Sequence, residues 1–282
     1  MPTDNDSQQP AISFIGAGNM ARAILGGLIA NGYNPEKIWA SAPEDSHLQA
    51  LRNDFGIFTT TDNRHCAQQA DILILAVKPQ VMADVCRDLA SVVQNTRPLS
   101  VSIAAGLDTA TLGGWLGGGA PVVRCMPNTP SLVGEGASAL YATDDVGEEE
   151  RESVTQIFES IGLAIWLDDE QMMHAVTALS GSGPAYCFMV LESLESAATE
   201  AGLEPEMARK LAIQTMSGAA RMAGQSDDDP AQLRRNVMSP GGTTERAIQV
   251  FEEGGLRSLI KRAYDAARIR SAELSEQLKK SL

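Results

Sequence analysis

The sequence predicts an α/β protein: a doubly wound parallel sheet in the N-terminal part, followed by a C-terminal part built only of helices. Short apolar runs alternate with helix-compatible stretches from Ala11 onward, which is typical of strands joined by crossover helices. A glycine-bearing turn, Gly16 to Ala21, lies directly after the first apolar run. After about Asp168 the strand pattern ends and only helical spacing remains.

The predicted strands follow one another along the N-terminal part. Apolar runs place them at residues 11–15, 38–41, 71–77, 99–105 and 122–126, and residues 137–142 and 163–167 can extend the same sheet. A helix over residues 20–29 follows the first strand, and another over 148–160 lies between the last two. The carboxyl ends of these strands should meet at one edge of the sheet, where ligands bind in open α/β folds.

The C-terminal part carries helical spacing throughout. The predicted helices span residues 172–179, 186–201, 205–223, 230–237 and 244–277, the last with a break at Gly254–Gly255. Small residues such as Ala197 and Gly218 suit close helix packing. This apolar helical part fits either a dimer interface or a core within one chain.

Composition narrows the classes of function. The chain has 282 residues, 44% of them hydrophobic, which is enough for a sizeable core. A formal net charge of -14 argues against a nucleic-acid partner. No apolar run is long enough to cross a bilayer, and the polar, acidic residues 1–10 are expected to be a disordered leader, so no membrane partner and a cytoplasmic location are expected. Four scattered cysteines indicate neither a metal site nor a disulfide framework.

The turn after the first strand has the spacing of a dinucleotide-binding fingerprint. Gly16, Gly18 and Ala21 match the pattern G-x-G-x-x-G/A. Gly16 permits the tight turn, Gly18 lets a pyrophosphate approach the backbone, and Ala21 lets the helix pack on the strand. The first amides of the helix would then face the phosphates. A glycine-rich turn without a ligand remains the alternative.

The choice between NADH and NADPH stays open. The second strand ends at Ser41, where a carboxylate would hold the ribose hydroxyls of NADH and a nearby arginine would accept the phosphate of NADPH. Lys78 ends the third strand, where it can approach the coenzyme or stand in solvent. Small residues at Ala104 and Ala105 let a flat ring lie close to the backbone.

A second glycine-bearing turn lies between two predicted helices, at residues 239–244. Gly241 and Gly242 offer backbone amides, and Thr243 or Thr244 can cap the next helix. Such a helix start can bind the carboxylate of a small substrate. The alternative is an ordinary capped helix.

The chain resembles pyrroline-5-carboxylate reductases in six separated stretches. They read FIGAGNMA from Phe14, AVKP from Ala76, SIAAG from Ser102, MPNTP from Met126, LSGSGPAY from Leu179 and NVMSPGGTT from Asn236. The resemblance implies a Rossmann-like dinucleotide-binding domain at 11–168 and a helical dimerisation and substrate domain at 169–282. It also implies a homodimer, often assembled into decamers, whose active sites are completed by the partner's helices.

The implied reaction is the reduction of the ring C=N of 1-pyrroline-5-carboxylate to L-proline with NADPH or NADH. The resemblance places the substrate on Ser239, Gly241, Gly242, Thr243 and Thr244, with Thr244 as the catalytic residue beside the ring nitrogen. It places the coenzyme on Ile15, Gly16, Ala17, Gly18, Asn19, Met20, Ser41, Pro43, Asn63, Ala76, Val77, Lys78, Pro79, Ala104, Ala105 and Asn236.

Some alternatives remain open at this point. Some relatives have a glutamate shortly before Asn236, where this chain has Asp227 to Asp229, so acidic assistance from there is doubtful. A reductase of a six-membered cyclic imine and a non-catalytic sensor of the NAD(P)H pool both fit the first turn, but the sensor would not need the second. No lysine or arginine lies between Arg151 and Arg209, which argues against the related β-hydroxyacid dehydrogenases.

Overall fold

A computed structural model describes residues 9–281 and divides the chain into two compact units. Unit 1 contains the residues up to Ser182 and those from Ala267 onward, and unit 2 contains Gly183–Ala266. This division lies later than the predicted boundary after residue 168, because residues 169–182 and the end of the chain group with the sheet. Most of the predicted leader lies outside the described residues; Gln9 and Pro10 lie within them.

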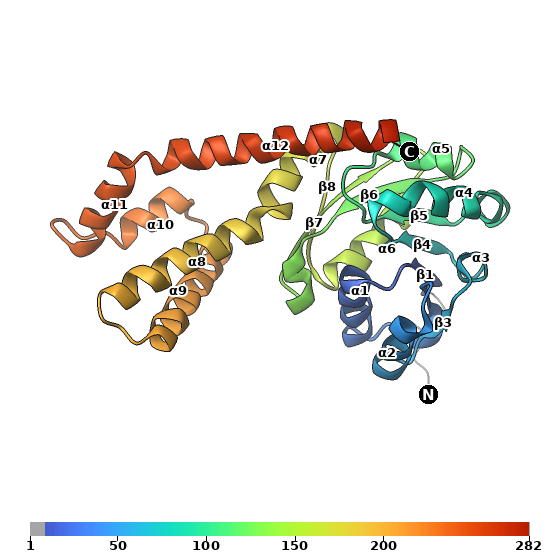
Figure 1. The fold of residues 1–282 in the computed structure, drawn as a ribbon, viewed down its shortest axis with the longest axis horizontal. Helices are drawn as coiled ribbons and strands as arrows, with labels where there is room; N and C mark the ends of the chain where they lie inside the picture. Colours follow the sequence, from blue (N-terminus) through green and yellow to red (C-terminus); the bar gives the residue numbers. More distant parts are fainter. Residues whose placement is uncertain (1–8, 282) are drawn as a thin grey trace. The chain divides into compact units, whose positions relative to one another are not determined.

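Unit 1 is built on a single twisted sheet, which has eight strands within the described residues (Figure 1). Their spatial order is β3-β2-β1-β4-β5-β6-β7-β8, and every neighbouring pair is parallel except β6 and β7. The strands are β1 (Ile12–Ile15), β2 (Ile38–Ser41), β3 (Phe58–Thr60), β4 (Ile72–Leu75), β5 (Leu99–Ser102), β6 (Val122–Met126), β7 (Gly136–Ala142) and β8 (Gly162–Trp166).

The helices of unit 1 connect these strands or follow the last of them. They are α1 (Asn19–Ala30), η1 (Pro35–Lys37), α2 (Asp45–Phe55), α3 (Asn63–Ala67), α4 (Pro79–Thr96), α5 (Thr109–Trp115), η2 (Thr129–Val133), α6 (Glu148–Glu159), η3 (Glu170–Met172), α7 (Met173–Val176) and the π-helical turn η4 (Thr177–Gly181).

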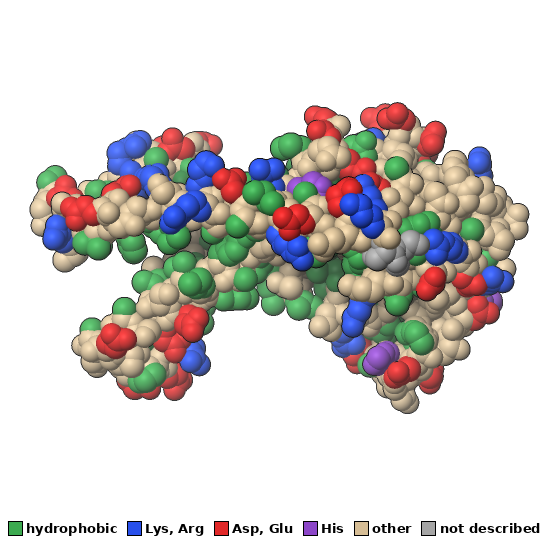
Figure 2. All heavy atoms as spheres, turned by 45° about the horizontal axis from the view of Figure 1, so that its top comes forward, with side chains coloured by type: hydrophobic (Ala, Val, Ile, Leu, Met, Phe, Trp, Pro, Cys, Tyr) green, Lys and Arg blue, Asp and Glu red, His purple; other side chains and the backbone are tan. Residues whose placement is uncertain are grey.

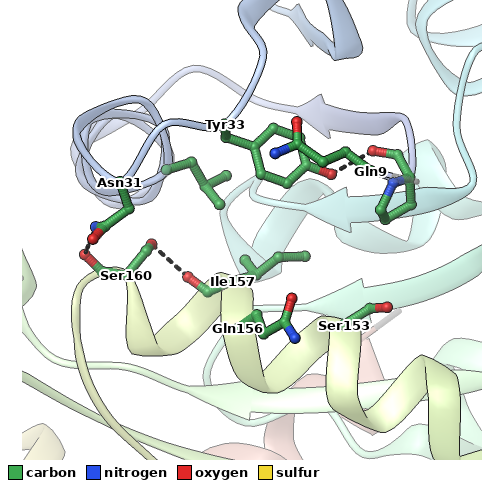
Figure 3. A pocket seen from close by; sticks show the side chains of 9 residues that line it. Gln9, Asn31, Tyr33, Ser153, Gln156, Ile157 and Ser160 are labelled. Atoms are coloured by element: carbon green, nitrogen blue, oxygen red, sulfur yellow. Dashed lines mark hydrogen bonds between the residues drawn. The ribbon is translucent and has the colours of Figure 1, made fainter. Parts of the chain in front are cut away.

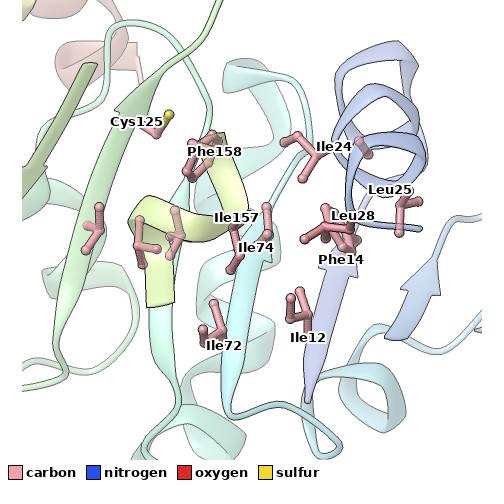
Figure 4. Close-up of a cluster of buried hydrophobic side chains, with 14 of the residues drawn as sticks. Ile12, Phe14, Ile24, Leu25, Leu28, Ile72, Ile74, Cys125, Ile157 and Phe158 are labelled. Carbon is pink, nitrogen blue, oxygen red and sulfur yellow. The ribbon is translucent and has the colours of Figure 1, made fainter. Parts of the chain in front are cut away.

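Two apolar cores cover the two faces of the sheet. Alternate residues of β4 show the division, because Ile72 and Ile74 point to one core and Leu73 and Leu75 to the other. The first core contains side chains from α1 and α6, among them Ile24 and Phe158 (Figure 4). The second core contains side chains from α3, α4 and α5. A sheet covered on both faces confirms the doubly wound fold predicted from the continuous apolar runs.

Two features of the sheet differ from the sequence prediction. The strand β3 was not predicted, because its three residues are partly or fully exposed and show no apolar pattern. The strand β7 runs antiparallel to β6, which brings the following strand β8 parallel to β7. Strand direction depends on the path of the connecting segment, which apolar patterning does not encode.

Unit 2 consists of helices, as predicted. They are α8 (Gly183–Glu200), α9 (Pro205–Gln225), α10 (Pro230–Asn236), α11 (Thr243–Glu253) and the first part of α12 (Leu256–Ser281). The predicted break at Gly254–Gly255 separates α11 from α12, and Gly255 has a φ of 71°. Asp229 caps α10 by accepting a hydrogen bond from the Gln232 amide at 2.7 Å.

Large apolar side chains are exposed on the helices of unit 2, seen as green groups at the left of Figure 2. Phe188 is 64% exposed, and Met189, Leu211 and Ile260 are also exposed. Such a surface is unusual for a monomer and marks a contact with another molecule. Within residues 9–281, no helix combines the length and the apolar character needed to span a membrane.

Candidate functional site

The predicted coenzyme turn joins the ends of three neighbouring strands. Gly16 follows β1, and its amide donates to the carbonyl oxygen of Ser41 at the end of β2, at 2.9 Å. The Ala76 amide after β4 donates to the carbonyl oxygen of Ile15 at 2.8 Å. Gly16 has a φ of 107°, and an added Cβ would lie 2.6 Å from the Ala76 carbonyl oxygen. Gly16 is therefore required by both the backbone and the neighbouring strand.

Gly18 is glycine for a different reason. Its φ is -76°, which any residue adopts, and a Cβ placed there would meet no atom within 4 Å. The protein itself therefore does not require glycine at this position, whereas the close approach of a pyrophosphate would.

The start of α1 also fits a phosphate group. Helix α1 begins at Asn19, without a side-chain cap and without an acidic residue in its first turn. The first amides of a helix have no intrahelical acceptor, and the positive end of the helix dipole favours an anion. The residues of this turn thus fit a dinucleotide on geometry alone.

At the end of β2, Ser41 lies beside Asn63. The Ser41 hydroxyl donates to the side-chain oxygen of Asn63 at 2.8 Å, while Pro43 is exposed nearby in sequence. A carboxylate in this place would select the ribose of NADH, but Ser41 carries none. Arg64 does not supply a free cation in this region, because its guanidinium is paired with Asp88 at 2.6 Å.

The ends of β4 and β5 complete the same edge of the sheet. Lys78 is exposed and precedes α4, whose first residue is Pro79. The Ile103 amide donates to the Leu75 carbonyl oxygen at 3.2 Å, which places Ala104 and Ala105 beside the end of β4. The structure thus brings together the coenzyme residues that were predicted in unit 1: Ile15, Gly16, Ala17, Gly18, Asn19, Met20, Ser41, Pro43, Asn63, Ala76, Val77, Lys78, Pro79, Ala104 and Ala105.

The stretches around Asn128 and Ser180 also meet in unit 1. The side-chain amide of Asn128 donates to the Ser180 carbonyl oxygen at 3.0 Å, and its oxygen accepts from the Ala137 amide at 2.9 Å. A Cβ at Gly181 would lie 2.7 Å from the terminal carbon of Met126. Two of the six sequence stretches therefore form one packed junction.

The second turn, residues 239–244, lies in unit 2 and starts α11. Two of its backbone amides already have hydrogen-bond acceptors in the turn or in α11. The Gly241 amide donates to the carboxylate of Glu245 at 2.7 Å, and the Gly242 amide donates to the Ser239 carbonyl oxygen at 2.9 Å. A carboxylate therefore already rests on one amide that the sequence assigned to a substrate carboxylate. The first amides of α11, beginning at Thr243, have no acceptor within the helix.

The side chains of this turn remain accessible. Ser239 and Thr243 are exposed and Thr244 is half-buried, and no side chain caps α11. Asn236, the remaining predicted coenzyme residue, also lies in unit 2. Its amide nitrogen donates to Asp228 at 3.1 Å and its oxygen accepts from Gln232 at 2.6 Å.

The sequence did not reveal a buried charged cluster beside the end of β5, where Arg124 of β6 pairs with Ser102. Arg124 of β6 is 4% exposed and contacts Glu170 of η3 at 3.2 Å. Glu170 also accepts hydrogen bonds from the amide and the hydroxyl of Thr109, at 2.9 and 2.8 Å. The only signal in the sequence was an arginine within an apolar strand, which predicts a buried partner but not its identity.

His174 lies beside this cluster and was also missed. Its Nδ1 contacts the Ser271 hydroxyl at 3.0 Å. Partial burial lowers the pKa of His174, and the positive charges of Arg124, Lys279 and Arg268 lower it further, against the opposing effect of Glu170. The neutral imidazole is therefore favoured in the folded chain.

A cavity of about 410 Å³ lies between the end of α1 and α6. Figure 3 shows Tyr33, Gln9 and Gln156 around it, and the Tyr33 hydroxyl donates to the carbonyl oxygen of Pro10. Burial, and then the charge of Asp71, raise the pKa of Tyr33. None of the predicted site residues lines this cavity, which therefore is not part of the predicted site.

Two family models match the chain in separate regions. Residues 11–106 match the description NADP oxidoreductase, coenzyme F420-dependent, and residues 170–274 match pyrroline-5-carboxylate reductase dimerisation. The first region contains the turn at Gly16 and Gly18, and the second contains the turn at 239–244.

Individual relatives match over nearly their whole length. A pyrroline-5-carboxylate reductase of Pseudomonas aeruginosa is 47% identical over 269 residues, covering 95% of this chain and 98% of the relative. The solved structure of such a reductase from Coxiella burnetii is 44% identical with a TM-score of 0.92, covering 95% and 99% of the two chains. A pyrroline carboxylate reductase of Plasmodium falciparum, solved with NADP bound, is 30% identical with a TM-score of 0.83, covering 94% and 98%.

Proposed function

The chain belongs to the family of pyrroline-5-carboxylate reductases, and we propose from this membership and the two turns how its residues carry out the reaction. It is an NAD(P)H-dependent oxidoreductase that reduces 1-pyrroline-5-carboxylate to L-proline, the last step of proline biosynthesis. The observation that carries the residue assignment is the presence of both turns, one suited to a pyrophosphate and one to a carboxylate.

The coenzyme is bound along the carboxyl edge of the sheet in unit 1. The amides at the start of α1 bind the pyrophosphate over Gly18, where the structure leaves open space. The Ser41–Asn63 pair contacts the ribose beside Pro43, and Ala104 and Ala105 leave room for a flat ring. When bound, NADPH or NADH supplies the hydride. Asn236 in unit 2 contributes one further contact.

The substrate carboxylate is bound at the start of α11. It replaces the Glu245 carboxylate on the Gly241 amide and uses the free amides of the first helical turn, with Ser239, Gly242 and Thr243 shaping the turn. The Glu245 contact supports this assignment, because it shows that the turn accepts a carboxylate at hydrogen-bond distance.

Thr244 holds the ring nitrogen. Its hydroxyl can donate or accept, so it serves a protonated and a neutral imine equally. A dedicated strong acid is not needed, because an imine nitrogen can already carry its proton on binding. The contribution of the chain is chiefly positioning of the ring for attack at its C=N carbon.

A dimerisation region covers residues 170–274, and the exposed apolar helices of unit 2 fit a homodimer in which the partner's helices complete each active site. Dimers can assemble further into decamers. The protein acts in the cytoplasm. Sedimentation of the purified protein and fractionation of cells measure these two points directly.

Replacing Thr244 by alanine tests the catalytic assignment. We expect kcat/KM for the imine to fall about tenfold, which is the effect of one lost hydrogen bond of about 1.4 kcal/mol. The assay follows loss of absorbance of NADH and of NADPH with 1-pyrroline-5-carboxylate, and it also gives the coenzyme preference.

The matched control is Thr244→Ser, which retains the hydroxyl and should retain most of the activity. Unchanged kcat and KM in Thr244→Ala would remove Thr244 from the mechanism. A kcat/KM that is higher for the six-membered imine than for the pyrroline would reassign the substrate.

A further inference from the structure

The loop between β5 and α5, residues 103–108, forms part of the coenzyme edge. Its residues Ala104 and Ala105 lie beside the end of β4 because the Ile103 amide donates to the Leu75 carbonyl oxygen. The Ala104 amide also donates to the Ser102 hydroxyl, at 3.3 Å. The position of this loop therefore sets the shape of the edge against which a flat ring would lie.

The last turns of α12 contact this loop with one stripe of side chains. Ser275, Leu278 and Lys279 have the spacing of a single helix face. Ser275 is 5% exposed, and its hydroxyl donates to the Gly106 carbonyl oxygen at 2.7 Å. Leu278 packs against the second apolar core and lies so close that a Cβ at Gly106 would approach it to 3.0 Å.

An ion pair adds a further contact between α12 and the β5–α5 loop. Lys279 contacts Asp108 at 2.6 Å, and Asp108 also accepts from the Thr111 amide at 2.8 Å, which caps α5. Burial alone would raise the pKa of Asp108, but the hydrogen bonds from Lys279 and Thr111 outweigh it and lower the pKa. The pair therefore stays ionised around neutral pH.

The other end of the loop is held by the buried cluster. Glu170 accepts from the Thr109 amide and hydroxyl, and it is fixed in turn by Arg124. The loop is thus held between η3 and the end of α12, two segments that follow the sheet in sequence and belong to the same unit.

We propose that Ser275 and Lys279 are positioning residues for the coenzyme: from the last turns of α12 they hold the β5–α5 loop so that Ala104 and Ala105 fit the nicotinamide ring. This inference rests on the proposed coenzyme site at the carboxyl edge. Neither residue touches the coenzyme. Ser275 acts through Gly106, and Lys279 acts through Asp108. A shift of the loop by a fraction of an ångström would loosen the ring contact, and ring placement is sensitive to such shifts.

The test compares coenzyme binding in the full-length protein with and without these contacts. The variants are Ser275→Ala, Lys279→Met and the double variant, with dissociation constants for NADPH and NADH measured by titration calorimetry. We expect the dissociation constant of the preferred coenzyme to rise about 3- to 5-fold in each single variant and about tenfold or more in the double variant. These factors correspond to the loss of hydrogen bonds of ordinary strength. The KM for the imine should stay within about twofold, since none of the replaced contacts involves a residue of the substrate turn.

Two controls separate positioning from general destabilisation. Lys280→Met removes a neighbouring exposed cation and should leave coenzyme binding unchanged. Lys279→Arg keeps the charge opposite Asp108 and should restore most of the affinity. The proposal is overturned if the double variant binds the coenzyme within twofold of the parent affinity. It is also overturned if the coenzyme dissociation constant and the KM for the imine rise by the same factor.

Direct coenzyme titration also keeps this test separate from the proposed reaction. If the parent protein failed to reduce 1-pyrroline-5-carboxylate, the proposed function would fail, while the effect of Ser275 and Lys279 on coenzyme affinity would still be measured.

Discussion

Unit 1 and unit 2 bury their apolar side chains to very different degrees. In unit 1 the sheet carries a core on each face, with Phe14, Ile74 and Leu75 fully buried. Within unit 2, all of whose residues the structure describes, Ala208 is the only buried residue. Large side chains such as Phe188 and Met189 stand exposed there instead.

This difference indicates that the two units acquire stability in different ways. A sheet with helices on both faces can close its own cores, because each strand is covered from two sides. The helices of unit 2 also carry large apolar side chains, yet the single chain leaves them in water, at a cost in free energy that grows with the exposed apolar area. The match of residues 170–274 to a dimerisation family agrees with this difference, and we propose that a second chain covers the surface.

The largest effect should come from emptying a core of unit 1. Phe14→Ala removes a fully buried ring from β1 and should lower the free energy of unfolding by about 3–5 kcal/mol. Urea unfolding at fixed protein concentration measures this change. Phe58→Ala is the matched control, because Phe58 is 46% exposed and its ring contact is a stack on Trp39. Equal losses in the two variants would contradict the difference in burial.

A charge on the exposed surface of unit 2 should act on assembly rather than on folding. We expect Phe188→Asp to raise the dissociation constant of the dimer at least about a hundredfold, since each of two symmetry-related rings loses burial worth about 1.5–3 kcal/mol. Sedimentation velocity over a concentration series measures the shift.

Ser91→Asp places the same charge on an exposed position of α4 in unit 1 and should leave the dimer intact. A dimer that persists unchanged in Phe188→Asp would show that this side chain faces solvent in the assembly.

The smallest expected effect is a pH dependence that originates in unit 1. The lowered pKa of His174 means that the unfolded chain binds a proton more readily than the folded one. The contribution of His174 to the free energy of unfolding is therefore fully present above the ordinary pKa of 6.5. This contribution declines as pH falls below 6.5 toward the lowered pKa of the folded state. Urea unfolding between pH 7.5 and 5.5 should show a shallower decline in His174→Gln than in the parent chain. Identical slopes would refute this assignment.

Parts of the candidate site could be predicted because short stretches encode them. Gly16 and Gly18 mark the predicted coenzyme turn through spacing alone. The structure requires glycine at Gly16, whereas a Cβ at Gly18 would meet no atom within 4 Å, so only the proposed pyrophosphate would require glycine there. The turn at 239–244 was also visible from its glycines and threonines. The contact of Glu245 with the Gly241 amide was not, because it depends on the positive φ of 74° at Gly241.

The sequence by itself determined the alternation of strands and helices, the glycine-bearing turn after β1 and the change to an all-helical C-terminal part. These features follow from side-chain periodicity and turn stereochemistry, which act over a few neighbouring residues. Only the tertiary structure decided the antiparallel direction of β7, the pairing of Arg124 with Glu170 and the contact of Ser275 with Gly106. Ser275 and Gly106 are 169 positions apart in the sequence. Contacts of this kind form only when the whole chain has folded, so no local sequence pattern predicts them.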